Sequence, residues 1–226
     1  TGVAGGEHAA IAVGDGKAEL EKVHGDLARL YAFVQDADAA PTLAVEQAAA
    51  GALVVVDEAY IDYSSGDHLD LYRKYENVAL LRTRSKVGFA ALRVGWLIAR
   101  PGLVGELDKV RLPYNLPSDS QSIASTVLTE LGGEVAAIAA AVKDERERLS
   151  TALADVPRVA ATPSQANFVW LKTERPAGEV FDALCQKKIL VRSFHARGGR
   201  LASQLRVTVG ARHENDAFLQ ALREVT

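Results

Sequence analysis

Apolar and polar positions follow one another along this chain in a pattern typical of an α/β protein. The unbroken apolar runs Leu53–Val56 and Val78–Leu81 predict strands buried on both faces of a parallel sheet. Three later runs, Ala166–Leu171, Ile189–Arg192 and Leu205–Val209, predict further short strands. Helix-like stretches separate the runs. The pattern therefore predicts a large α/β lobe with a mostly parallel sheet, followed by a smaller α+β lobe.

The helices are predicted from their 3.6-residue periodicity, over Asp119–Leu131, Glu134–Ala154, Ala177–Lys187 and from about Glu214 to the end. Gly132-Gly133 is expected to stop the first of them. Within the second, Lys143–Arg148 places Glu and Arg at helical offsets, which predicts a solvated face. Residues 1–120 are expected to form the large lobe, incomplete in its N-terminal part. Residues 121–226 are expected to form bridging helices and the small C-terminal lobe, with the boundary between 120 and 145.

Candidate chemistry gathers where the first two strands end. Asp57 and Tyr60 follow the first strand, and Ser85, Lys86 and Arg93 follow the second. Ligands of parallel sheets bind outside the carboxyl ends of the strands. Such a site would offer an acid for a heterocyclic nitrogen, an amine for a carbonyl and a cation for a phosphate. Pyridoxal 5′-phosphate (PLP) needs all three. The alternative is structural, because an acid after a strand often caps the next helix.

Two arginines stand out in the C-terminal part of the chain. Arg192 and Arg206 each lie in a short apolar run that is predicted to be a strand. A guanidinium in such a place is costly to desolvate unless an anion meets it. The two side chains are therefore candidates for binding an anionic substrate. The alternative is that Arg206 pairs with a neighbouring acid.

Several longer motifs carry a family resemblance. They are Asp57-Glu58-Ala59-Tyr60, Arg82-Thr-Arg-Ser-Lys86, Ala91-Leu-Arg93-Val-Gly-Trp96, Pro113-Tyr-Asn115, Ser120-Gln121, Pro163-Ser-Gln-Ala-Asn167-Phe168 and Leu205-Arg-Val-Thr-Val-Gly210. From about Leu53 to the end, the chain resembles the histidinol-phosphate aminotransferases in the order of these motifs. That family belongs to the aspartate-aminotransferase-like, fold-type I group of PLP enzymes. The Asp and the Lys are common to the whole group, whereas the longer runs are narrower.

The resemblance implies a role for each candidate. Asp57 matches the partner of the pyridinium nitrogen, Tyr60 the ligand of the phenolic oxygen and Lys86 the Schiff-base lysine and general base. Ser85 and Arg93 match ligands of the cofactor phosphate. Of the later arginines, Arg206 matches the one that binds a substrate carboxylate or other terminal polar group, and Arg192 the one associated with the substrate phosphate.

The implied reaction is amino transfer between histidinol phosphate with 2-oxoglutarate and imidazole-acetol phosphate with glutamate, in a homodimer. Two alternatives stay open. One is a related fold-type I enzyme, such as an aromatic aminotransferase or a threonine-phosphate decarboxylase. The other is a non-catalytic relative with a decayed site.

The chain departs from the family before Leu53. Gly5–Ile11 is a faint match to the phosphate-binding turn, and Asp38–Leu43 is a faint match to an Asn-Pro turn whose ring-contacting Asn is absent. Either the chain is a truncated or decayed member, or stretches of it are missing from the sequence. The absence of any methionine in 226 residues favours the second explanation.

Composition limits the remaining classes of function. A net charge of −3 offers no basic footprint for nucleic acid. No apolar run approaches the ~20 residues that span a bilayer, and the single cysteine, Cys185, favours a reducing compartment. The five histidines lack metal-ligand spacing, so no metal site is expected. These features predict a cytoplasmic enzyme acting on small molecules.

Overall fold

The computed structural model describes Ala49 and residues 51–226, which form two compact units. The first contains the described residues up to Ile61 and Gly66–Gly132. The second contains Asp62–Ser65 and Gly133–Thr226. Four residues that follow the first strand closely in sequence are thus grouped with the C-terminal half of the chain.

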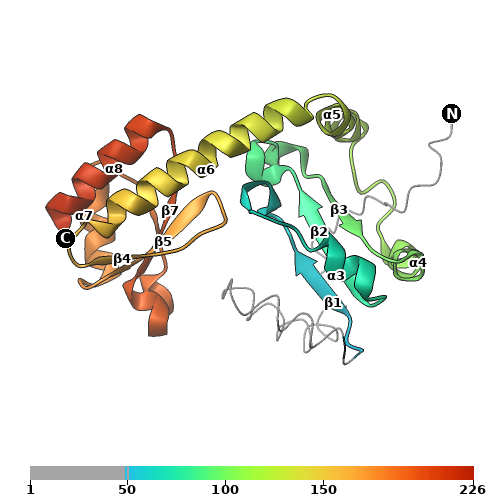
Figure 1. Cartoon of the computed structure of the whole chain (residues 1–226), viewed down its shortest axis with the longest axis horizontal. Coiled ribbons are helices and arrows are strands. Elements are labelled where there is room, and N and C mark those ends of the chain that lie inside the picture. Colours follow the sequence, from blue (N-terminus) through green and yellow to red (C-terminus); the bar gives the residue numbers. More distant parts are fainter. Residues whose placement is uncertain (1–48, 50) are drawn as a thin grey trace. The chain divides into compact units, whose positions relative to one another are not determined.

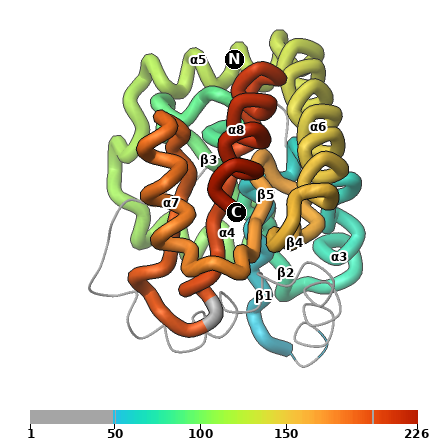
Figure 2. The backbone as a smooth tube through the Cα atoms, turned by 90° about the vertical axis from the view of Figure 1, so that its left-hand side faces the viewer, coloured from blue at the N-terminus to red at the C-terminus, as the bar shows by residue number. Residues whose placement is uncertain are grey.

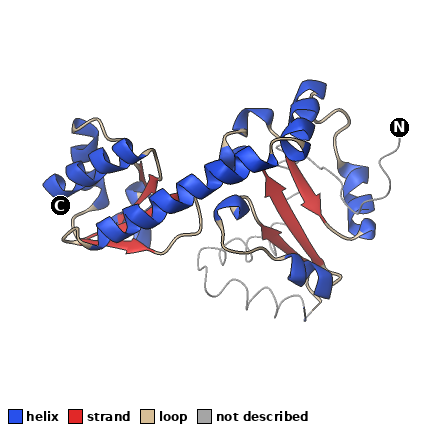
Figure 3. Ribbon diagram, turned by 45° about the horizontal axis from the view of Figure 1, so that its top comes forward, coloured by secondary structure: helices blue, strands red, loops and turns tan. Residues whose placement is uncertain are grey.

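The first unit is built on a three-stranded sheet (Figures 1 and 3). The central strand, β2, pairs in parallel with β1 and antiparallel with β3. Val54, Val78 and Leu80 are buried beneath α3, where they pack with Tyr72. The elements are β1 (Val54–Asp57), α3 (Leu69–Lys74), β2 (Val78–Thr83), the 3₁₀ turns η2 (Ser85–Val87) and η3 (Ala90–Leu92), β3 (Gly95–Ile98), α4 (Pro101–Val110) and α5 (Ser118–Thr129).

The second unit is a four-stranded sheet, in the order β4-β5-β7-β6, with three helices. Its strands are all antiparallel to their neighbours. The elements are η1 (Ile61–Tyr63), which the chain enters from the first unit, α6 (Gly132–Ala154), β4 (Val159–Thr162), β5 (Phe168–Thr173), α7 (Ala177–Gln186), β6 (Arg192–Ser193), η4 (His195–Arg197), η5 (Gly199–Ser203), β7 (Gln204–Thr208) and α8 (Arg212–Val225).

One face of this second sheet forms the larger core of the described residues. Leu171 and Leu205 are opposite each other in the β5–β7 register and are fully buried. The apolar stripes of α6, α7 and α8 cover them, and α7 and α8 lie side by side (Figure 2). Fully burying each leucine contributes roughly 1.5–3 kcal/mol. Because side chains alternate along a strand, the adjacent pair in the register, Trp170 and Arg206, points to the opposite face of the sheet.

Most predicted elements are confirmed with small shifts at their ends, but two predictions are wrong. Gly132-Gly133 does not stop a helix; α5 has already ended at Thr129, and the two glycines form the first turn of α6. The predicted strand Ile189–Arg192 is reduced to Arg192–Ser193. Lys188 adopts a φ of +63° after α7, and the Ile189 amide donates back to the Leu184 carbonyl, so these residues end the helix instead.

The predicted solvated face of α6 is also wrong at one position. Arg146 is only 7% exposed, although its neighbours in the charge run include exposed residues. Its guanidinium donates hydrogen bonds to two backbone carbonyls.

Among the described residues, no single helix is long and apolar enough to cross a membrane, although α5 and α6 together, as a bent pair, meet that test by length and composition.

Candidate active site

The parallel pairing of β1 with β2 brings the first group of predicted site residues to one edge of the sheet. Asp57 is the last residue of β1 and is level with Leu81 of β2. Lys86 follows the end of β2 by three residues, within η2. Since the two strands run in the same direction, both residues leave the sheet at its carboxyl-end edge, as the sequence predicts.

Tyr60 and Lys86 lie next to each other at this edge. The Lys86 Nζ atom is 5.2 Å from the centroid of the Tyr60 ring. Both side chains are partly buried, whereas Asp57 is exposed. The Asp57 carboxylate accepts a hydrogen bond from the Ala59 amide through Oδ1, at 2.9 Å, which turns the chain after β1 toward Tyr60. The carboxylate of Asp57 and the phenol of Tyr60, which follow β1, and the amine of Lys86, which follows β2, therefore lie at the same edge of the sheet.

The turn that carries Lys86 is fixed by its neighbours. The Ser85 amide donates to the Thr83 hydroxyl at 3.0 Å, and that hydroxyl donates to the Val94 carbonyl at 2.8 Å. Gly88 closes the turn with a φ of +108°, a conformation that L side chains rarely adopt. Lys86 is thus held on a short, well-anchored turn, which limits the directions in which its amine can point.

Arg93 lies just after η3 and also adopts an unusual backbone conformation. Its φ is +57°, and its guanidinium is exposed, with one long hydrogen bond from Nη1 to the Ala90 carbonyl at 3.4 Å. A non-glycine residue held in this region costs free energy and is often found at functional sites. An exposed guanidinium on such a turn is suited to a phosphate.

Glu58, beside Asp57, is a residue whose importance the sequence did not reveal. Its side chain is 1% exposed. It accepts hydrogen bonds from the amide and Nδ1 of His68, at 2.8 and 3.0 Å, and from Nε of Arg82, at 2.6 Å. Arg82 also donates to Asp67 at 3.1 Å. This network ties the end of β1 to β2 and to the start of α3.

The electrostatics of Glu58 follow from these contacts. Burial by itself raises the pKa of the carboxyl, but the hydrogen bonds from His68 and Arg82 outweigh it and hold the pKa below its ordinary value. For Arg82, burial lowers the pKa of the guanidinium, and the bonds to Glu58 and Asp67 outweigh it and raise that pKa. Glu58 is therefore ionised at neutral pH, and its charge is matched within the strand edge that carries Asp57.

The two arginines of the second unit form one rung of its sheet. Arg206 of β7 is directly opposite Arg192 of β6 on one side and Trp170 of β5 on the other. Directly opposed residues point to the same face, and like charges in that position repel. The Arg206 guanidinium lies 4.9 Å from the centroid of the Phe168 ring. Within the part of the chain that the structure describes, its buried Nε atom has no hydrogen-bond partner.

This arrangement bears on the alternative considered for Arg206. Among the described residues, no acid forms an ion pair with it. Two opposed guanidiniums on an aromatic-lined face, one with an unsatisfied donor, favour an anionic ligand.

The matches at Gly5–Ile11 and Asp38–Leu43 lie outside the described residues.

Comparison with known proteins identifies the family. The model of the class I and II aminotransferases matches residues 36–225. The chain belongs to this family. The histidinol-phosphate aminotransferase of Aquifex aeolicus is 41% identical over 174 residues, which are 77% of this chain and 49% of that protein. This aminotransferase-family chain therefore spans about half the length of the curated relatives it matches.

Solved structures of related proteins show the same fold. The histidinol-phosphate aminotransferase of Sinorhizobium meliloti, in complex with PLP, is 25% identical with a TM-score of 0.66, over 76% of this chain and 48% of that one. The L-threonine-O-3-phosphate decarboxylase of Porphyromonas gingivalis is 19% identical with a TM-score of 0.70, over 81% and 57%. The predicted fold-type I architecture is confirmed for this aminotransferase-family chain.

Proposed function

We propose that this chain forms part of a PLP-dependent aminotransferase that exchanges an amino group between histidinol phosphate and 2-oxoglutarate. The observation that carries the proposal is the position of Lys86 beside Tyr60, at the sheet edge where Asp57 emerges. The 41% identity with a histidinol-phosphate aminotransferase supports the choice of substrate.

The residues present fit the cofactor. Bound PLP supplies an aldehyde for an amine and a protonated ring that accepts electrons from the substrate carbon. Asp57, exposed at the end of β1, would keep the proton on the ring nitrogen. Tyr60 would donate a hydrogen bond to the phenolic oxygen, while Ser85 and the exposed Arg93 would hold the phosphate.

Lys86 has two tasks in this proposal. Its amine would hold the cofactor in the resting enzyme, and after displacement by the substrate amine it would move the proton from the substrate Cα. The short turn η2, anchored by Thr83, would hold the amine near that carbon. Amino transfer in two half-reactions predicts ping-pong kinetics.

The arginine rung supplies the anion-binding half of the proposal. Arg206, whose Nε lacks a described partner, would bind the carboxylate of the amino-acid donor. Arg192, opposite it, would bind the substrate phosphate. The enzyme is expected to work on small molecules, as a homodimer in the cytoplasm; both the dimer and the location stay predictions, and sedimentation of the full-length protein tests the dimer.

The experiment is an assay of the full-length protein with a panel of amino donors. Histidinol phosphate with 2-oxoglutarate should give glutamate at a higher kcat/KM than aromatic amino acids do. A preference for aromatic donors would replace the substrate assignment but leave the aminotransferase.

A second candidate is a decarboxylase acting on threonine phosphate, because the arginine rung suits a phosphate and a carboxylate whichever reaction follows. Release of carbon dioxide from threonine phosphate, with no glutamate formed, would select it. A non-catalytic relative that forms no Schiff base would leave the absorbance spectrum of added PLP unshifted.

A further inference from the structure

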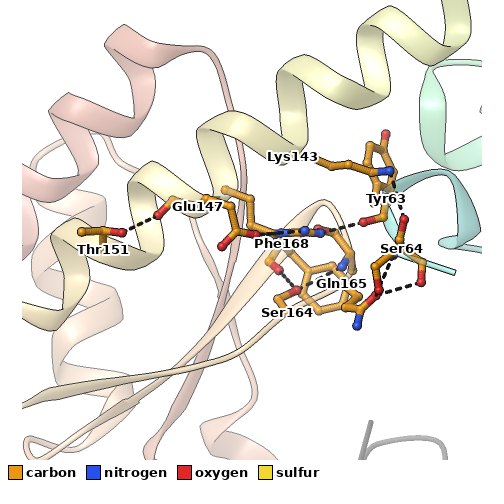
Figure 4. Close-up of polar contacts among 11 residues, drawn as sticks. Tyr63, Ser64, Lys143, Glu147, Thr151, Ser164, Gln165 and Phe168 are labelled. Carbon is orange, nitrogen blue, oxygen red and sulfur yellow. Dashed lines mark hydrogen bonds and ion pairs between the residues drawn. The ribbon is translucent and has the colours of Figure 1, made fainter. Parts of the chain in front are cut away.

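The segment that follows Tyr60 is held by side chains from distant parts of the sequence. Tyr63, Ser64 and Ser65 belong to the second unit, together with α6 and the loop between β4 and β5. Figure 4 shows polar contacts from Lys143, Gln165 and their neighbours converging on Tyr63 and Ser64. Tyr63 follows Tyr60 by only three residues, so whatever fixes Tyr63 also restricts the path of the chain at Tyr60.

Arg146 of α6 is the centre of these contacts. Its Nη1 atom donates to the Tyr63 carbonyl at 2.9 Å and to the Ala166 carbonyl at 3.1 Å. Its Nε and Nη2 atoms both donate to Glu147, at 3.1 Å. Burying a guanidinium costs desolvation free energy that an apolar side chain at the same position of the helix would not cost. Its position is explained by the two carbonyls that it joins.

Gln165 completes the arrangement from the β4–β5 loop. Its Oε1 atom accepts hydrogen bonds from the Ser64 hydroxyl at 2.8 Å, the Ser65 amide at 2.8 Å and the Ser65 hydroxyl at 3.0 Å. Lys143 adds a bond from Nζ to the Ser64 carbonyl at 3.0 Å. One acceptor oxygen and two cationic donors thus hold three consecutive residues.

The other end of the Tyr60 segment is fixed as well. Glu58 is buried and bonded to Arg82 and His68. Tyr60 therefore lies between two anchored points, Glu58 and Tyr63, each held by charged or polar side chains. Such double anchoring is what orientation of a ligand by a loop residue requires, because a loose segment would lose the geometry.

We propose that Arg146 and Gln165 are positioning residues for Tyr60, and that their hydrogen bonds to Tyr63–Ser65 set the affinity for PLP. This inference rests on the proposed function, because it assumes that Tyr60 contacts the cofactor. Neither Arg146 nor Gln165 touches the cofactor in this account. They act through the backbone of residues 61–65.

The test compares matched substitutions in the full-length protein. Gln165→Glu keeps an acceptor oxygen for the two serines, whereas Gln165→Leu removes it. Since Gln165 is exposed, neither change threatens folding. Arg146→Lys keeps the charge and one donor direction, and Arg146→Met keeps neither. Arg148→Met is the control, because Arg148 lies on the same helix but pairs with Glu145 and Asp216.

Two readouts are measured on each variant. The first is the dissociation constant of PLP, from titration of its absorbance. It should rise on the order of tenfold in Gln165→Leu, which loses three hydrogen bonds to Ser64 and Ser65, and in Arg146→Met, which loses those to the Tyr63 and Ala166 carbonyls. The dissociation constant should rise much less in Gln165→Glu, Arg146→Lys and Arg148→Met. The second is hydrogen exchange of the Ser65 amide without cofactor, which should accelerate in Gln165→Leu and not in Gln165→Glu.

The outcomes separate this inference from the proposed function. If the wild-type protein does not bind PLP, the proposed function fails. If the wild type binds PLP and Gln165→Leu binds it equally tightly while its Ser65 amide exchanges faster, the inference fails. A similar rise in Gln165→Leu and in Arg148→Met also overturns it, because the effect would then be general destabilisation.

Discussion

Removal of the cation beside Glu58 should destabilise the first unit strongly. Arg82→Met keeps most of the aliphatic stem but leaves the Glu58 carboxylate, 1% exposed, without its 2.6 Å partner. Breaking one side of a buried ion pair typically costs 3–5 kcal/mol. Because the Arg82 side chain is 18% exposed, we expect a loss of about 3 kcal/mol. The released Asp67 is exposed and adds little.

The loss should depend on pH in a defined direction. The folded-state pKa of Glu58 is below its ordinary value of 4.5. Its contribution to stability is therefore complete above that value and is lost as the pH falls through the folded-state pKa. A protonated Glu58 carries no charge to be matched. Arg82→Met should therefore lower the free energy of unfolding most at pH 7, and progressively less as Glu58 is protonated in acid.

Urea unfolding, followed by Trp96 fluorescence, measures the effect. Trp96 of β3 is directly opposite Arg82 of β2, and replacement of Trp170 by Phe removes the other tryptophan of the sequence. Arg82→Met, Glu58→Gln and the double variant form a cycle. A coupling energy of about 2 kcal/mol at pH 7 is expected. Additive effects, or a loss that does not shrink in acid, would show that Glu58 and Arg82 do not stabilise the fold as an ion pair.

Three further predictions concern the core, a turn and the arginine rung. Leu171→Ala should lower the free energy of unfolding in urea by about 3 kcal/mol because the side chain is fully buried. Leu190 is 82% exposed, so Leu190→Ala should change the same quantity by less than about 0.5 kcal/mol. Equal losses would contradict the assigned core. Gly88→Ala should cost about 1–2 kcal/mol because its φ is +108°, while Gly102→Ala, in α4 with open space around it, should be neutral or stabilising. Arg206→Lys keeps the charge but loses the fork, so KM for the amino-acid donor should rise on the order of tenfold with a smaller change in kcat; an unchanged KM would exclude it as the carboxylate ligand.

Local patterns predicted much of the fold. The consecutive apolar residues that became β1, β2 and β5, and the alternating apolar positions that became β7, can be recognised without their neighbours. The segment after α7 failed for a physical reason. Ile189 and Val191 are as apolar as strand residues, but Lys188 closes the helix in the left-handed region, and that conformation leaves no periodic trace in the sequence.

The candidate site was only partly visible in the sequence. Asp57 and Arg206 stand out because they end or interrupt an apolar run, and Lys86 because it lies in the polar segment after the second run. Arg146 does not, because its neighbours in the helix are also charged and its burial depends on Tyr63, far away along the chain. The burial of Glu58 depends on Arg82, which the neighbouring strand brings to it. Long-range contacts of this kind cannot be derived from local periodicity.

Covalent trapping of the cofactor reveals which amine of the protein carries it. The full-length protein is incubated with PLP, reduced with borohydride and digested, and the modified peptide is located by mass spectrometry. One phosphopyridoxyl group is expected, on Lys86, and none in Lys86→Ala. Modification of another lysine, or no modification in a protein that is folded, would contradict it.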